Sequence, residues 1–137
     1  MPSGNAPLVL AMVLCDHIIR EAGSNKFSLI GTFNGLWAPR FPTVHPSMAV
    51  YVALSDGRGL VPCCLRMRAM ETGKEVFSLK GQVEFRDPAA IAELVFQIQQ
   101  ARFEAPGNYS LEFVASNDLL STRRLMVQQS PPPRPAT

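Results

Sequence analysis

Cysteine is scarce in this sequence: the chain contains only Cys15, Cys63 and Cys64. Three thiols cannot all pair, and adjacent residues such as Cys63 and Cys64 point to opposite faces of a strand. Zinc ligands usually come as paired Cys or His residues at close, repeated spacings, and two cysteines with nothing between them are a poor chelating pair. We therefore expect free thiols, no metal, no cofactor and a reducing, cytoplasmic location.

An excess of charge of one sign is also missing. The 13 basic and 11 acidic residues give a net charge of only +2, and the basic residues are scattered along the chain. Nucleic-acid binding usually needs a basic stripe, whereas Arg123 and Arg124 point to opposite faces of a strand. The link at residues 56–59 lacks the lysine and the following helix of a phosphate-binding loop. We therefore expect no nucleic-acid partner.

Long hydrophobic runs are missing as well. The apolar run at residues 8–15 is too short to span a bilayer. No Lys or Arg precedes it, and Leu14 is bulky at the place where signal cleavage needs a small residue. We interpret this run as a buried first strand and expect no membrane insertion.

The sequence also lacks a recognisable catalytic constellation. Cys64 shares a predicted strand face with Arg66 and Arg68, whose charges would favour a reactive thiolate. An ordinary solvated or interface face explains the same pattern, and no nucleophile, base and orienting acid stand at a recognisable spacing. We therefore predict that the protein is not an enzyme and has no catalytic residue.

What the sequence contains is a series of short segments in which apolar and polar residues alternate. In the clearest of them, residues 109–115, the side chains of Tyr109, Leu111 and Phe113 fall on one side and polar residues on the other. Clusters of Gly, Asn, Asp and Pro separate the segments, as turns do. The predicted strands are residues 8–15, 26–33, 48–55, 63–70, 75–79, 82–85, 91–99, 109–115 and 119–127.

Eight or nine short strands at this spacing predict an all-β fold. We expect a single immunoglobulin-like antiparallel β-sandwich of about eight strands, with a barrel as the alternative. Residues 91–99 have the alanine and glutamate content of a helix, but their alternation predicts a strand. Residues 34–46 contain three prolines, which cannot donate to a sheet, so we expect an extended crossover between the sheets.

A chain of 137 residues with 47% hydrophobic content suits one domain with its own core. We place an N-terminal arm at residues 1–7 and the β-sandwich domain at residues 8–128. Residues 129–137 form a Pro-rich tail, which we expect to be extended because its prolines cannot join a sheet.

Four separated motifs occur in order along the chain. They are Leu-Cys-Asp-His at residues 14–17, Ser-Leu-Ile-Gly-Thr-Phe at 28–33, Phe-Pro-Thr-Val-His-Pro at 41–46 and Pro-Gly-Asn-Tyr at 106–109. Over residues 8–128 the chain resembles a family of small bacterial proteins that is described only as a domain of unknown function, with an immunoglobulin-like β-sandwich. The resemblance implies that fold, but it brings no activity, ligand or catalytic residue.

Our first hypothesis is a non-enzymatic protein-interaction or structural module. A sandwich exposes sheet edges that must be covered, charged or paired with another chain. We therefore expect a homo-oligomer or a component of a larger bacterial assembly, with contacts at one strand face and at the tail. The expected contact residues are Cys64, Arg66, Arg68, Pro131, Pro132 and Pro133.

The second hypothesis is a small-molecule-binding sandwich with its site under the crossover at residues 34–46. The expected lining residues are Trp37, Phe41 and His45. Trp37 and Phe41 fit equally well as cover for the edge of the core, and His45 fits as a ring hydrogen-bonded to the backbone.

Overall fold

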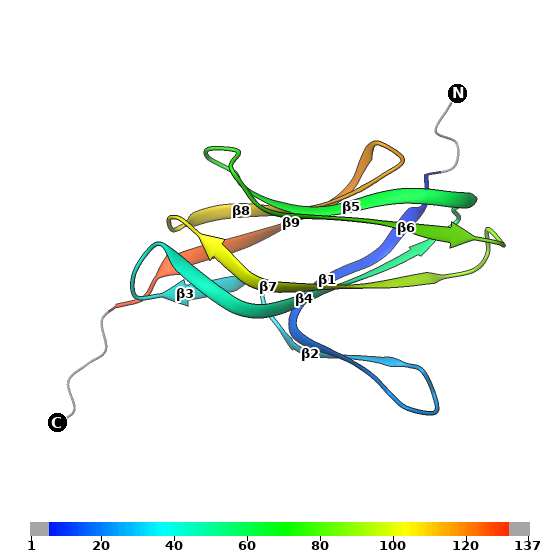
Figure 1. Cartoon of the computed structure of the whole chain (residues 1–137), viewed down its shortest axis with the longest axis horizontal. Coiled ribbons are helices and arrows are strands. Elements are labelled where there is room, and N and C mark those ends of the chain that lie inside the picture. Colours follow the sequence, from blue (N-terminus) through cyan, green and yellow to red (C-terminus); the bar gives the residue numbers. More distant parts are fainter. Residues whose placement is uncertain (1–5, 132–137) are drawn as a thin grey trace.

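Two β-sheets packed face to face make up the computed structural model, which describes residues 6–131 (Figure 1). The strands are β1 (Leu8–Arg20), β2 (Phe27–Thr32), β3 (Gly35–Ala38), β4 (Thr43–Ser55), β5 (Gly59–Ala69), β6 (Glu75–Phe85), β7 (Ala92–Phe103), β8 (Gly107–Ala115) and β9 (Asp118–Gln129). The four-stranded sheet has the order β2-β1-β4-β7, and the five-stranded sheet has the order β3-β9-β8-β5-β6. The predicted all-β fold is confirmed, with nine strands instead of about eight and no helix in the described residues.

The core lies between the two sheets and follows the alternation of the sequence. In β8, Leu111 and Phe113 point inward and are fully buried, and in β4 Met48 and Val50 do so from the opposite sheet. Burial of one large apolar side chain stabilises the folded state by about 1.5–3 kcal/mol. The interleaved side chains of β4 and β8 therefore hold the two layers together.

The first strand is longer than predicted because it pairs with two partners in turn. Its residues up to Cys15 pair with β4, and its residues from Cys15 onward pair with β2. The β1–β2 hairpin projects from the four-stranded sheet (Figure 1), and the Phe27 ring lies 6.0 Å from the Tyr51 ring of β4. Gly31, with a φ of +73°, lets the two strands of the hairpin approach, because a Cβ there would clash with the Asp16 carboxylate.

Residues 34–46 pass from the four-stranded sheet to the five-stranded sheet and back, as expected of a crossover. They are not free of strands, however, because β3 pairs in parallel with the last four residues of β9. The expectation of a fully antiparallel sandwich is therefore wrong at this pair. His45 lies in β4, which begins at Thr43, and not in the crossover itself.

Strands β6 and β7 follow one another in the chain and belong to different sheets. The segments 75–79 and 82–85 form one continuous strand, and residues 92–103 form a strand and not a helix. β6 is an edge of the five-stranded sheet and β7 is an edge of the four-stranded sheet. The two edges lie next to each other on one side of the molecule (Figure 1), which we call the open flank.

The chain after β9 is tied to β3 by one hydrogen bond, which the Ser130 amide donates to the Ala38 carbonyl oxygen at 2.9 Å. Pro131 is exposed. Pro132 and Pro133, with the rest of the predicted tail, lie outside the described residues, as do residues 1–5 of the predicted arm. In the part of the chain that the structure describes, no helix has the length and hydrophobicity needed to cross a membrane.

The core assignment predicts a large difference between two identical substitutions. Leu111→Ala, at a position that is 0% exposed, should lower the free energy of unfolding by about 3 kcal/mol, because it leaves a cavity between the sheets. Leu119→Ala, at a position that is 51% exposed, should change it by less than about 1 kcal/mol. Urea unfolding of both variants measures the difference, and equal effects would contradict the packing described above.

Candidate functional site

The crossover residues that were expected to line a ligand site do not form one pocket. A cavity of about 200 Å³ is lined by Trp37 and His45, among others, but not by Phe41. Trp37 is 63% exposed, and its indole Nε1 donates a hydrogen bond to Gln128 Oε1 at 3.0 Å. Small-molecule sites usually measure about 300–1,000 Å³. The structure thus brings two of the three residues together, around a cavity below the usual size.

The His45 side chain packs against Phe33, with the ring centroids 5.9 Å apart. Its Nε2 atom is buried and has no hydrogen-bond partner among the described residues. A ring hydrogen bond to the backbone, which the neighbouring prolines suggested, is therefore not seen at this nitrogen.

The strand face of Cys64, Arg66 and Arg68 lies on the outside of the five-stranded sheet, with Glu112 of β8 between the two arginines. Arg66 Nε donates to Glu112 Oε1 at 2.7 Å, and Arg68 Nη2 donates to Glu112 Oε2 at 3.0 Å. The Ser110 hydroxyl donates to the same Oε2 atom at 3.2 Å. Glu112 is only 4% exposed, whereas the two arginine side chains are 34% and 43% exposed. The arginines are therefore held in place and still accessible.

The charge of this cluster follows from its contacts. Burial raises the pKa of Glu112, but the hydrogen bonds from Arg66 and Arg68 lower it by more, so the pKa lies below its ordinary value of 4.5. At neutral pH the carboxylate is ionised and offsets one of the two guanidinium charges. We call Arg66, Arg68 and Glu112 the arginine cluster, and its net charge is positive.

Of the two consecutive arginines in β9, Arg123 and Arg124, only Arg124 lies on the outer face that carries the arginine cluster. Arg124 is the cross-strand neighbour of Ser110 on the outer face. Arg123 instead donates to the Met12 carbonyl oxygen at 3.0 Å, on the other side of the sheet. The expectation from strand alternation that they point to opposite faces is confirmed.

The three cysteines are free. Cys15 and Cys63 are buried, and burial raises the pKa of both thiols, which keeps them protonated at neutral pH. Cys64 Sγ lies 3.3 Å from Ser78 Oγ on the outer face. Within residues 6–131, no group of three or more His, Cys, Asp or Glu side chains is arranged to hold a metal ion.

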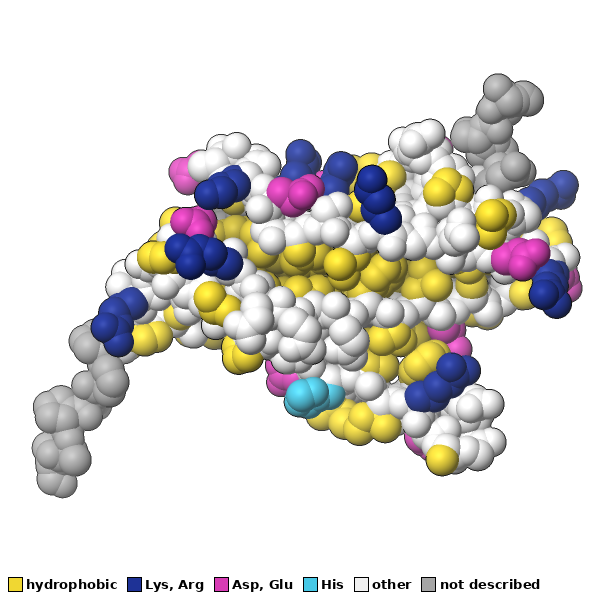
Figure 2. Space-filling view, in the orientation of Figure 1, with side chains coloured by type: hydrophobic (Ala, Val, Ile, Leu, Met, Phe, Trp, Pro, Cys, Tyr) yellow, Lys and Arg dark blue, Asp and Glu magenta, His cyan; other side chains and the backbone are white. Residues whose placement is uncertain are grey.

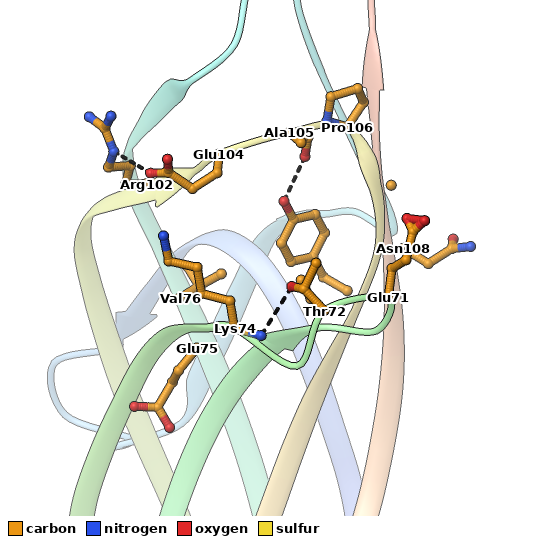
Figure 3. Close-up of a pocket in the computed structure, with 13 residues that line it drawn as sticks. Glu71, Thr72, Lys74, Glu75, Val76, Arg102, Glu104, Ala105, Pro106 and Asn108 are labelled. Carbon is orange, nitrogen blue, oxygen red and sulfur yellow. Dashed lines mark hydrogen bonds and ion pairs between the residues drawn. The ribbon is translucent and has the colours of Figure 1, made fainter.

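A larger cavity, of about 450 Å³, lies at one end of the sandwich between the β5–β6 turn and the β7–β8 loop (Figure 3). We call it the end pocket. Its apolar lining comes from Ala69, Val76 and the ring of Tyr109. Burial raises the pKa of Tyr109, so the phenol stays protonated and donates to the Ala105 carbonyl oxygen at 2.6 Å.

The rim of the end pocket carries both signs of charge. Figure 3 shows Arg102 at the end of β7, Glu104 on the loop that follows it and Lys74 on the facing turn. Arg102 Nε donates to Glu104 Oε2 at 2.5 Å, and this contact, with a smaller effect of Lys74, holds the pKa of Glu104 below its usual value. Glu71 and Glu75 also line the pocket. An apolar lining with charges of both signs at its rim suits an amphipathic ligand that carries both charges.

Sequence reasoning missed the end pocket. Its residues come from two turns that are far apart in the chain, and only the packing of the two sheets brings them together. The one local signal is the Pro-Gly-Asn-Tyr turn at residues 106–109, which places Tyr109 at the start of β8.

The open flank also exposes apolar surface. Figure 2 shows a band of hydrophobic side chains between the two layers of the molecule. Partly buried apolar residues of β6 and β7 pack against the core here. They are Val76, Phe77, Leu79, Ala92, Leu94 and Phe96. No backbone ladder covers the outer edge of either strand in the described residues. The flank therefore combines unpaired backbone groups with apolar side chains.

Residues 10–128 match the family described as "Family of unknown function (DUF6941)". The match covers most of the chain, so the chain belongs to this family. No curated protein matches the chain.

Two solved structures that resemble the chain are of the β-glucosidase from Listeria innocua. With the enzyme in complex with isofagomine, the TM-score is 0.45 and the identity is 11%, over 70% of this chain and 15% of that chain. With the enzyme alone, the TM-score is 0.44 and the identity is 12%, over 69% of this chain and 14% of that chain. The chain thus spans about 15% of the length of the first structure. At these scores the likeness carries no argument about what this chain does.

The arginine cluster predicts a pH-dependent stability. The pKa of Glu112 is lower in the folded state than in the unfolded state. The stability that its charge contributes is therefore fully present at pH values above the ordinary pKa of 4.5, and it is lost as the pH falls through the lowered pKa. Glu112→Gln should therefore lower the free energy of unfolding by about 2 kcal/mol at pH 7. The difference from the unmodified protein should shrink below about pH 4.5.

Urea unfolding between pH 3 and pH 7 measures this difference, with pH values chosen to span the titration of a carboxylate at about 4. Glu84→Gln is the matched control, because Glu84 is 60% exposed and lies 3.9 Å from Arg86, so little change is expected. A difference for Glu112→Gln that persists undiminished in acid would show that its charge is not what stabilises the sheet.

Proposed function

We propose that this member of the DUF6941 family is a non-enzymatic, cytoplasmic protein-interaction module of the immunoglobulin-like type. It forms a homo-oligomer or belongs to a larger bacterial assembly. The observation that carries the proposal is the open flank, where two long edge strands lie next to each other with apolar side chains between them. The free thiols of all three cysteines support a reducing location.

The strand order supports the immunoglobulin-like type. Immunoglobulin domains have strands A, B, E and D in one sheet and C, F and G in the other. Here β1, β4 and β7 stand next to one another in the order A-B-E, and β5, β8 and β9 stand in the order C-F-G. The assignment also follows the chain, since β1, β4, β5, β7, β8 and β9 come in the sequence order A, B, C, E, F, G.

A second feature supports the same assignment. In immunoglobulin-like domains a tyrosine near the start of strand F donates its hydroxyl to the backbone a few residues upstream. Tyr109 lies near the start of β8, in the position of strand F, and its hydroxyl bonds to the carbonyl oxygen of Ala105, four residues upstream.

The open flank supports an interaction role because unpaired strand edges tend to add another strand. β6 has 11 residues and β7 has 12, which is long enough for a stable ladder with a partner. A partner strand here would satisfy the backbone groups and cover the apolar band shown in Figure 2. Both gains favour association over an isolated monomer.

The arginine cluster supports a second contact region, where the interaction residues Cys64, Arg66 and Arg68 were expected. Arginine is enriched in protein interfaces. Glu112 fixes both guanidinium groups, so a partner carboxylate would meet donors that are already ordered.

The second candidate function is the binding of a small molecule, and the end pocket is the observation that favours it. Its volume of about 450 Å³ lies within the usual range for ligand sites, unlike the crossover cavity of about 200 Å³. For this candidate function we therefore propose a ligand site at the turn and loop around Tyr109, in place of the expected site at Trp37, Phe41 and His45.

The proposed interaction role predicts that a charge on the open flank weakens self-association. Val95 of β7 is 37% exposed, and Val95→Lys places an ammonium group on the edge strand, where a lysine opposes the addition of another strand. We expect light scattering to give an oligomer for the unmodified protein and a lower mass for Val95→Lys at the same concentration.

Met126→Lys is the matched control. Met126 is an apolar strand residue that is 45% exposed, but its strand, β9, has neighbours on both sides. This variant should keep the mass of the unmodified protein. A strict monomer without a co-purifying protein would contradict the proposed function, and an oligomer that Val95→Lys leaves intact would place the contact outside the open flank.

The end pocket predicts ligand-dependent stability. In a thermal-shift assay with zwitterionic dipeptides that contain an aromatic residue, a ligand at tenfold its Kd should raise the Tm by roughly 5 °C. The shift should fall in Lys74→Ala, which removes a charge from the rim, and should persist in Trp37→Ala. A shift that disappears only in Trp37→Ala would return the site to the crossover, and no shift in any protein would contradict this second candidate.

A further inference from the structure

Four strands lie at sheet edges, and they differ in how well an added strand can pair with them. β3 has four residues and β2 has six. β6 is long, but it carries Lys80 and Gly81 near its middle, and both residue types oppose pairing at an edge. β7 has 12 residues and carries no charge from Leu94 to Ala101. Among the described strands, β7 is therefore the long edge that lacks these protective features.

The charges of β7 stand at its two ends. Glu93 is near the start and Arg102 is near the end, with eight uncharged residues between them. In a parallel pairing of two copies, like charges would meet at both ends. In an antiparallel pairing, Glu93 of each copy would approach Arg102 of the other, and the strand is therefore complementary to itself in the antiparallel direction only.

The backbone at Gln100 places these two charges on the same face. Before it, Leu94, Phe96 and Ile98 point toward the core. Gln100 has a φ of +56°, and after it the buried residues are Ala101 and Phe103. This shift of one position puts Arg102 on the exposed face that also carries Glu93, while the register with β4 continues without a shift. Without the irregularity, Glu93 and Arg102 would point to opposite faces, and the charge complementarity would be lost.

The existing contacts of Glu93 and Arg102 leave both side chains able to form an ion pair with a second copy. Glu93 accepts a hydrogen bond from the neutral Tyr51 hydroxyl, and none of the ion pairs among the described residues involves it. Arg102 pairs with Glu104, but both side chains are about half exposed, at 58% and 46%, so one guanidinium edge remains available.

From these observations we propose that the partner at the open flank is a second copy of this chain, joined by antiparallel pairing of β7 with β7 about a two-fold axis near Gln97. The inference rests on the proposed function and specifies its partner and geometry. The pairing joins two four-stranded sheets into one continuous sheet of eight strands in the order β2-β1-β4-β7-β7-β4-β1-β2. Each dimer then contains the Glu93–Arg102 contact twice.

Charge reversal tests the direction of pairing. Glu93→Lys and Arg102→Glu each replace two attractive contacts per dimer with two repulsive ones, so each should raise the dimer Kd about tenfold in sedimentation velocity. The double variant Glu93→Lys/Arg102→Glu restores opposite charges and should return the Kd close to its original value. The Tm of each variant checks that the chain is folded.

A cysteine at the expected axis tests the register. Gln97→Cys should form a disulfide-linked dimer under mild oxidation. With Gln100 left unpaired in the new ladder so that Glu93 meets Arg102, residue 97 of one copy meets residue 97 of the other. Met126→Cys, on a strand with neighbours on both sides, is the control and should cross-link far more slowly, as should the unmodified protein.

Each outcome supports or overturns the inference. Recovery in the double variant together with rapid cross-linking of Gln97→Cys supports it. A stable dimer that none of these variants affects, or a double variant weaker than both single ones, overturns the β7 pairing but leaves self-association standing. A protein that stays monomeric at its highest soluble concentration overturns the pairing, and the proposed function then depends on a different protein partner.

Discussion

The packing of β4 against β8 is the interaction on which the other features of this molecule depend. Both strands bury one face completely against the opposite sheet, and the large side chains there are fully inaccessible to water. Two sheets held in this way must turn their remaining polar residues outward. The arginine cluster is one result, since Glu112 alternates with the buried Leu111 and Phe113 and meets two arginines on the outside. The end pocket is another, because it forms where the two layers separate at their ends.

Alternation along single segments was enough to predict most strands and their buried faces. Residues 109–115 are an example, because a half-buried strand needs no knowledge of its partner to reveal its inward side. Features that depend on a partner were not predictable. β1 continues to Arg20 only because β2 folds back on it, and β3 exists because β9 lies beside it. The end pocket was missed for the same reason, since Lys74 and Arg102 approach each other only after the sheets have packed.

Two kinds of surface on this molecule differ in how they suit a partner. In the arginine cluster Glu112 already accepts hydrogen bonds from both arginines, although Arg68 Nε has no partner among the described residues. A partner there gains charge complementarity without covering unpaired backbone. The open flank has unpaired backbone groups and apolar side chains, and it gains more from being covered. The positive φ of Gln100 determines the charge pattern of the open flank, because this backbone irregularity places Arg102 on the exposed face.

The parallel pairing of β3 with β9 has a consequence for how the chain acquires its structure during translation. Trp37 and Gln128, which are hydrogen-bonded across this pair, are 91 residues apart in the sequence. A nascent chain emerging from the ribosome therefore exposes β3 without its neighbour until nearly the whole domain has been synthesised. Contacts this distant in sequence form late and slowly. The sandwich is thus completed only after β9 leaves the exit tunnel. Until then β3 and the edge of β8 that pairs with β9 are exposed surfaces that chaperones can cover.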